Sequence, residues 1–239
     1  MQTSLAQFSE TQSQDAFALQ NPKLLKVRLD AVTVQAKLGA MVAYQGEVTF
    51  EHAGSGGIGR MLKKAMSGEG SPLMKISGTG EVFLAFQAQD VHILKLENEA
   101  ITCNGANVLA FDAGIDWDIK RAEGMGAMMG GGLYNMSLAG SGWVAVMSDG
   151  PPVLLSTGPE TPTFADPQAA ITWSGNLQTT VKTDVNLKTF IGKGSGESVQ
   201  IGFVGQGWVL VQPSEGRLMP TAGSGGGGGG GGLLGNLGG

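Results

Sequence analysis

Three stretches of the chain match one another: residues 77–84 read SGTGEVFL, residues 139–146 read AGSGWVAV, and residues 204–211 read VGQGWVLV. The step from Gly78 to Gly140 is 62 residues, and the step from Gly140 to Gly205 is 65. In each stretch a pair of glycines precedes a short apolar run, which is typical of a strand with a bulge or a sharp bend at its start. A fixed step between like segments predicts an internal repeat.

A second set of matching segments lies upstream of the glycine pairs. Residues 41–44 (MVAY), 108–111 (VLAF) and 170–173 (AITW) each end in an aromatic residue, and they recur at steps of 67 and 62. Two landmarks at similar steps predict three copies of one unit. The interval between the landmarks is five residues longer in the first copy than in the second, and three residues longer in the third. Length variation of this kind predicts a surface connection.

Short alternating patterns fill the rest of each unit. Residues 25–30, 48–50 and 91–97 alternate apolar and polar side chains, as half-buried strands do, and turn residues punctuate the chain about every eight to twelve positions. These features predict an all-β fold of the sandwich type. Residues 58–66 are the exception, because their apolar side chains recur at helical spacing. We therefore expect one short helix in the first unit.

Composition excludes several classes of protein. Of 239 residues, 41 are Gly, and 15 Lys plus Arg face 20 Asp plus Glu for a formal charge of −5. This balance argues against a chain built to cover nucleic acid or acidic lipid. A single cysteine excludes a disulfide framework and a cysteine-based metal site.

The first 22 residues contain no Lys or Arg and no long apolar run. A secretory or transit signal needs such features, so we expect a cytoplasmic protein of bacterial type, peripheral to a membrane at most.

The same patterns predict where the chain divides. We expect an N-terminal segment over residues 1–22, β modules over 23–87, 88–150 and 151–215, and a Gly-rich flexible tail over 216–239. The tail ends in an apolar stretch around Leu233 and Leu234, which either docks on the modules or stays disordered.

The three Gly-x-Gly strands at Gly78, Gly140 and Gly205, together with residues 56–63 (GGIGRMLK), resemble the AIM24 family. This is a domain of unknown function whose modules are similar to the tryptophan RNA-binding attenuation protein (TRAP). The resemblance covers about residues 20–215. It implies three tandem small β-sandwich modules, TRAP-like and of the double-stranded β-helix type, with a pseudo-threefold arrangement in one chain and commonly a homo-oligomer.

The family's biology transfers only in part. Its mitochondrial members look to be associated with the inner membrane and to support respiratory-complex or cristae organisation, but this chain lacks a presequence. The attenuation protein's RNA and tryptophan sites have no matching residues here, and the Lys and Arg residues are scattered rather than gathered in a stripe.

Glycine-rich motifs do not point to a cofactor. Residues 54–59 satisfy Gly-x-Gly-x-x-Gly, but a dinucleotide site needs a parallel βαβ unit, and no helix alternates with strands here. A loop is the favoured interpretation. The surroundings of Lys193 lack the spacing of a phosphate-binding Walker loop. We predict no cofactor.

Candidate catalytic and metal-binding residues are few. Asp112, Asp116 and Asp118 could contribute to a calcium site, but a solvated acidic face is favoured. His52 and His92 lack a paired ligand motif and are expected on strand surfaces. Cys103 lies in an apolar run that predicts a buried, unreactive thiol. We therefore predict a protein that is not an enzyme, with no catalytic residue and no metal.

Methionines concentrate in or beside the variable connections of the first two units. Such side chains suit an adaptable contact surface, but filling gaps between modules or packing against a neighbouring subunit is the favoured interpretation. The predicted partner-binding residues are Ile58, Arg60, Met61, Leu62, Lys63, Lys64, Met66, Met125, Met128 and Met129.

The leading hypothesis is a non-catalytic scaffold or binding protein that forms a homo-oligomer and contacts a protein or membrane partner through these connections. The alternative is a small-ligand or RNA binder that uses grooves between modules. There Trp143, Trp173 or Trp208 would stack on a base, although core packing is favoured for each of them.

Overall fold

The computed structural model describes residues 4–52, 73–121, 134–183 and 199–214, and in this part of the chain the predicted all-β fold is confirmed. Helical structure there is confined to two 3-10 segments, η1 (Ser4–Phe8) and η2 (Gly105–Asn107). The strands are β1 (Phe17–Asn21), β2 (Leu24–Lys37), β3 (Met41–His52), β4 (Leu73–Leu84), β5 (Asp90–Asn104), β6 (Val108–Asp112), β7 (Asp116–Arg121), β8 (Tyr134–Ser148), β9 (Val153–Thr157), β10 (Thr163–Ala165), β11 (Ala170–Ser174), β12 (Gln178–Thr183), β13 (Val199–Val204) and β14 (Gly207–Val211).

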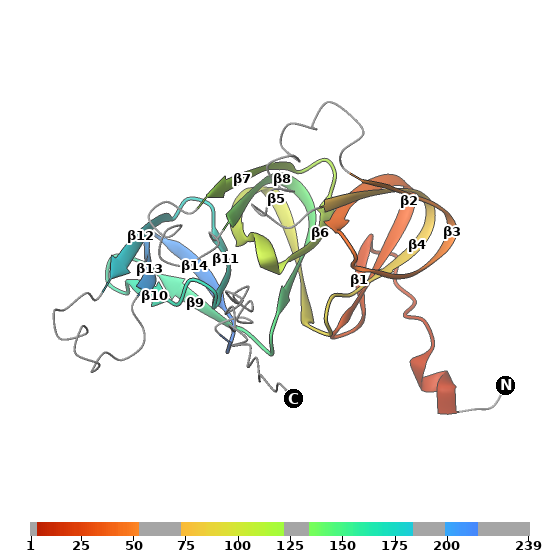
Figure 1. Ribbon diagram of the computed structural model, residues 1–239, viewed down its shortest axis with the longest axis horizontal. Coiled ribbons are helices and arrows are strands. Elements are labelled where there is room, and N and C mark those ends of the chain that lie inside the picture. Colours follow the sequence, from red (N-terminus) through yellow and green to blue (C-terminus); the bar gives the residue numbers. More distant parts are fainter. Residues whose placement is uncertain (1–3, 53–72, 122–133, 184–198, 215–239) are drawn as a thin grey trace, which may run out of the picture.

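The strands form two antiparallel sheets. An 11-stranded sheet runs in the order β3-β4-β2-β6-β8-β5-β11-β14-β9, with β1 paired to β2 and β7 paired to β8. A three-stranded sheet has the order β10-β13-β12. Figure 1 shows the strands in three groups along the long axis, with β1–β4 at one end, β5–β8 in the middle and β9–β14 at the other end. The large sheet therefore passes through all three groups.

The glycine pairs lie where the longest strands change direction. In β8, Gly140 and Gly142 have positive φ, and the opposite strand β5 carries a bulge between Glu97 and Glu99. The pairing of β4 with β2 repeats this arrangement, with a bulge between Asp30 and Thr33. A bulge opposite residues of left-handed conformation bends the ladder without separating the strands. These glycines thus adopt the positive φ that the sequence interpretation invoked, and the bulges lie on the strands opposite them.

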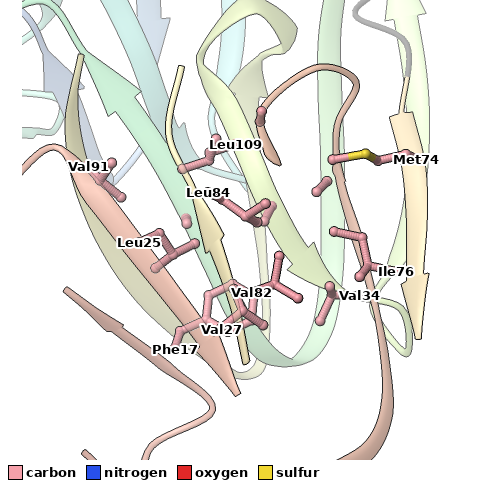
Figure 2. Packing of buried hydrophobic residues seen from close by; sticks show 14 of the residues in the cluster. Phe17, Leu25, Val27, Val34, Met74, Ile76, Val82, Leu84, Val91 and Leu109 are labelled. Carbon is pink, nitrogen blue, oxygen red and sulfur yellow. The ribbon is translucent and has the colours of Figure 1, made fainter. Parts of the chain in front are cut away.

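Buried side chains form three clusters, one around each group of strands. Figure 2 shows the first cluster, in which Leu25, Val27, Ile76 and Val82 from β2 and β4 meet Leu109 from β6. The second cluster centres on β5–β8 and the third on β11, β13 and β14. Replacing one such Leu or Ile by Ala in a packed core costs about 2 to 5 kcal/mol.

The strand predictions for residues 25–30, 48–50 and 91–97 are confirmed by β2, β3 and β5. Lys26 departs from the alternating pattern, because its side chain is buried rather than solvated. The predicted helix over residues 58–66 and the variable connections lie outside the described residues, as does the Gly-rich tail.

We predict that Gly80→Ala destabilises the fold strongly. Gly80 has φ +147°, and a Cβ atom there would overlap the backbone carbonyl oxygen of Gln45 on β3. The substitution should lower the free energy of unfolding by about 3 to 5 kcal/mol, because strain and backbone overlap act together. Denaturant unfolding followed by circular dichroism measures this loss.

Two matched variants separate the effect of conformational strain from that of backbone overlap. Gly140 has φ +122° but open space where an added methyl group would lie, so Gly140→Ala should cost only the conformational strain, about 1 to 2 kcal/mol. Gly114 also has open space, and Gly114→Ala should stay within about 0.5 kcal/mol of the wild type. Equal losses for Gly80→Ala and Gly114→Ala would contradict the account.

Candidate functional site

The outer edge of β3 carries several exposed apolar side chains in the described part of the chain. Within them β3 pairs only with β4, so its other edge presents unpaired backbone groups to solvent. Val42 is 60% exposed and Tyr44 is 49% exposed, and Met41 beside them is also exposed. The strand has 12 residues, about twice the usual length of five to six.

Aromatic packing holds part of this edge in place. The rings of Tyr44 and Phe50 meet edge-on, with centroids 5.3 Å apart and an interplanar angle of 65°. A long strand edge with apolar side chains is a template for an additional strand, which its backbone groups would bind by hydrogen bonds. The geometry of this edge is compatible with the addition of another strand.

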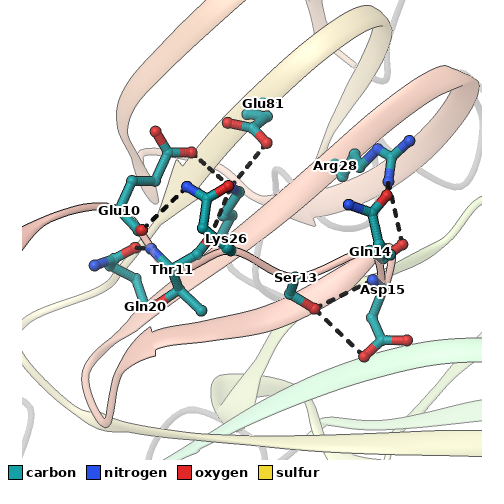
Figure 3. A network of polar contacts seen from close by, with 10 residues as sticks. Glu10, Thr11, Ser13, Gln14, Asp15, Gln20, Lys26, Arg28 and Glu81 are labelled. Carbon is teal, nitrogen blue, oxygen red and sulfur yellow. Dashed lines mark hydrogen bonds and ion pairs between the residues drawn. The ribbon is translucent and has the colours of Figure 1, made fainter.

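The N-terminal segment lies across the same group of strands and is fastened by polar contacts (Figure 3). The Lys26 ammonium on β2 donates to Glu10 Oε1 at 2.5 Å and to the Thr11 carbonyl oxygen at 3.1 Å. It also pairs with Glu81 Oε1 on β4 at 2.8 Å. Arg28 donates to the Gln14 side-chain oxygen at 2.5 Å. These contacts join residues 10–14 to β2 and β4.

The positive charge of Lys26 interacts favourably with the carboxylates of Glu10 and Glu81. Burial alone would lower the pKa of Lys26, but its hydrogen bonds to Glu10 and Glu81 and the charges of both carboxylates outweigh burial and raise it above 10.5. Hydrogen bonding with the Glu81 carboxyl and with Lys26 lowers the pKa of Glu10 below 4.5. The buried lysine therefore stays charged, as a buried cation must when it is paired.

The three aspartates considered for a calcium site, Asp112, Asp116 and Asp118, have different surroundings in the structure. Asp112 Oδ2 accepts the backbone N–H of Trp143 at 2.7 Å, which makes this carboxylate a support for the bend in β8. Burial raises the pKa of Asp112, and that hydrogen bond partly opposes the effect. Asp116 is exposed and Asp118 is half-buried on β7. Among the described residues, no group of three or more His, Cys, Asp or Glu side chains could hold a metal ion.

Both histidines are expected on strand surfaces, and the structure describes one of these side chains. His92 on β5 is half-buried, and its Nε2 lies 2.7 Å from the Ser148 hydroxyl. Burial lowers the pKa of His92, while the nearby Asp90 opposes that effect. Ser148 is fully buried and donates its own proton to the Gly150 carbonyl oxygen, so the pair closes a turn. The side chain of His52 lies outside the described residues.

The tryptophans differ in exposure. Trp173 is 2% exposed and packs edge-on against Phe203, so it presents no face to a ligand. The ring of Trp143 stacks on Phe17 from β1, with Lys95 Nζ 5.3 Å from the indole centroid. Trp208 packs in part against the second buried cluster. Each of these indoles thus contributes to packing.

The predicted partner-binding residues, from Ile58 to Met66 and from Met125 to Met129, lie outside the described residues. The sequence patterns did not indicate the exposed edge of β3, although residues 41–44 are one of the repeat landmarks. One signal could have found it. This segment is the first of the three matching segments along the sequence.

Comparison with known proteins identifies the family. The family model described as "Mitochondrial biogenesis AIM24" matches residues 17–214, a range that includes every strand found in the described residues. The chain belongs to the AIM24 family. The resemblance drawn from the glycine pairs is therefore confirmed.

The AIM24 fold also recurs among solved structures. The crystal structure of protein SPYM3_0169 from Streptococcus pyogenes aligns with a TM-score of 0.65 and 23% sequence identity, covering 82% of this chain and 91% of that one. Identity at this level shows a shared fold. No curated protein matches the sequence significantly. None of the helical segments in the described part of this AIM24 protein has the length and apolar character needed to cross a membrane.

Cys103 on β5 should be unreactive in the folded AIM24 protein. Its side chain is fully buried, and Sγ donates to Thr172 Oγ1 at 3.2 Å. Burial raises the pKa of the thiol to about 12, while the Thr172 hydrogen bond opposes the rise. At neutral pH a thiol reagent should therefore label almost no native protein but one thiol per chain after unfolding. Rapid native labelling at neutral pH would contradict this prediction.

Glu10→Gln should weaken the fastening of the N-terminal segment. Because the folded pKa of Glu10 lies below 4.5, its charge stabilises the fold above pH 4.5, and this contribution disappears as the pH falls through the folded pKa. We expect a loss of about 1 kcal/mol in the free energy of unfolding at neutral pH, shrinking towards zero in acid. Denaturant unfolding over this pH range measures the difference.

Glu99→Gln, at an exposed position on β5, is the matched control and should stay within about 0.5 kcal/mol of the wild type at neutral pH. A loss for Glu10→Gln that is the same at neutral and acid pH would show that the charge has no part in the fastening.

Proposed function

We propose that this AIM24-family chain is a non-catalytic scaffold that assembles with copies of itself and contacts a protein or membrane partner through its Met- and Gly-rich connections. The observation that carries the proposal is the open edge of β3, with Met41, Val42 and Tyr44 exposed. Large apolar side chains on an unpaired strand edge favour association.

Strand register supports the proposal that three similar modules make up the body. The aromatic residue of each upstream landmark pairs with the valine two positions after the second glycine of its own motif. The pairs are Tyr44 with Val82, Phe111 with Val144, and Trp173 with Val209. The same pairing in three places is expected if one unit was copied twice. The approximately threefold arrangement of the units stays a prediction.

The connections between these units also support a scaffold. β6 pairs with β2 of the preceding unit, and β11 pairs with β5 of the preceding unit. Each junction is therefore made by backbone hydrogen bonds and extends one sheet. Low charge, at 15% of residues, is consistent with further association, because interface cores are depleted of charged side chains.

The assembly part of the proposal is tested by size-exclusion chromatography with light scattering. We expect a particle several times the 24.5 kDa chain mass at micromolar concentration. A monomer under these conditions would contradict it.

The partner part is tested by deleting residues 56–68, which include all the predicted contact residues of the first connection. We expect partners captured from the source cells, or binding to anionic phospholipid vesicles, to decrease several-fold while the oligomer persists. An equally long deletion in the tail, residues 223–235, is the control and should leave both unchanged. Unaltered capture and vesicle binding after the first deletion would argue against this contact surface.

A further inference from the structure

The exposed start of β3 has two buried counterparts in the same chain. Residues 41–44 correspond by landmark to residues 108–111 on β6 and residues 170–173 on β11. Every residue of the two later segments is buried, whereas all four residues of the first are exposed. Equivalent segments of similar character thus differ in burial.

The difference has a clear structural cause. Phe111 on β6 lies opposite Gln35 on β2, and Trp173 on β11 lies opposite Thr102 on β5. In both cases the covering strand belongs to the preceding unit. β3 belongs to the first of these units along the sequence, and among the described residues its only strand partner is β4, which leaves Tyr44 uncovered on the other side.

The opposite end of the molecule carries the matching half of such a junction. Gln35 and Thr102 pair within their own units with the residue three positions before the first glycine of the motif, Lys75 and Ser137. In the third unit the residue three positions before Gly205 is Gly202, and it pairs with Phe164 on β10. Phe164 therefore occupies the position that covers an aromatic residue at the other two junctions.

The exposure of Phe164 is consistent with an open strand edge beside it. β10 forms an edge of the three-stranded sheet, and Phe164 is 47% exposed. Its ring lies beneath Lys182 Nζ, 5.0 Å from the centroid. Figure 1 shows β3 and β10 at opposite ends of the molecule, so one copy of the chain does not bring these edges together.

We propose that β10 of one copy pairs with β3 of a second copy and continues the internal junctions from chain to chain. The inference rests on the module repeat and self-assembly of the proposed function and names the two edges that meet. The internal registers predict antiparallel pairing of Phe164 with Tyr44, Thr163 with Gln45, and Ala165 with Ala43. The junction adds an aromatic cross-strand pair and covers the exposed apolar edge of β3.

The junction is head-to-tail, because two different edges meet. Each added copy leaves one β3 edge and one β10 edge open until a ring closes or a filament grows. This asymmetry allows a test that an interface between two identical edges would fail.

The test uses two exposed substitutions, Val42→Lys on β3 and Phe164→Lys on β10, each checked for native circular dichroism. Each variant alone should lose the oligomer and run near 24.5 kDa in size-exclusion chromatography with light scattering. Every junction in either preparation contains one blocked edge. An equimolar mixture should restore a single junction and give a particle of two chains and no larger, since one variant keeps its β10 edge and the other keeps its β3 edge.

Disulfide trapping tests the register. A mixture of Tyr44→Cys and Phe164→Cys chains should form a disulfide-linked dimer under mild oxidation, because these residues lie directly opposite in the proposed pairing. Thr49→Cys, exposed further along β3, replaces Tyr44→Cys as the matched control and should give at least ten-fold less cross-linked product. The native Cys103 is buried and does not compete.

The outcomes separate this inference from the proposed function. A monomeric wild-type chain overturns both. A wild-type oligomer that keeps its size in Phe164→Lys overturns the β10–β3 junction and leaves self-assembly standing. Loss of the oligomer in Val42→Lys alone, with no mixed dimer, assigns β3 to an interface with itself and also overturns the inference.

Discussion

Antiparallel pairing between successive groups of strands is the interaction on which the rest of the structure depends. β6 lies along β2 and β11 lies along β5, so the backbone of each group is completed by its predecessor. Buried backbone N–H and C=O groups need partners, and these junctions supply them at the places where the three buried clusters meet. Removing a junction would expose both an apolar segment and a row of unpaired backbone groups, as at β3.

Glycine conformation and bulges make this arrangement compatible with long strands. β5 and β8 pair along nearly their whole length, yet the ladder bends at Gly140 and Gly142 opposite the bulge beside Asn98. Asp112 then supports the bend from the neighbouring strand by accepting the Trp143 N–H. In the third group the same bend interrupts the strands, so that β13 and β14 are separated at Gly205. The glycine pairs thus occur both within long continuous strands, such as β8, and between two shorter strands, β13 and β14.

The N-terminal segment adds a second kind of constraint to the first group. Its contacts centre on one buried ammonium, Lys26, which is paired with Glu10 and Glu81. A buried cation is stabilising only when its partners are present, so the segment and the strands beneath it are coupled. Phe17 extends this coupling to the middle group by stacking on Trp143.

The amino-acid sequence by itself determined the all-β class, the strands around the glycine pairs and the burial of Cys103, because these follow from local periodicity and from glycine's access to positive φ. The family followed separately, from the resemblance of the glycine motifs to those of known proteins. It did not determine that Lys26 is buried or that Asp112 supports a bend, since both depend on partners distant along the chain. The exposure of β3 was decided only by the tertiary structure. Residues 41–44 and 108–111 have nearly the same apolar pattern, and only the presence of a neighbouring strand buries one and leaves the other at an open edge.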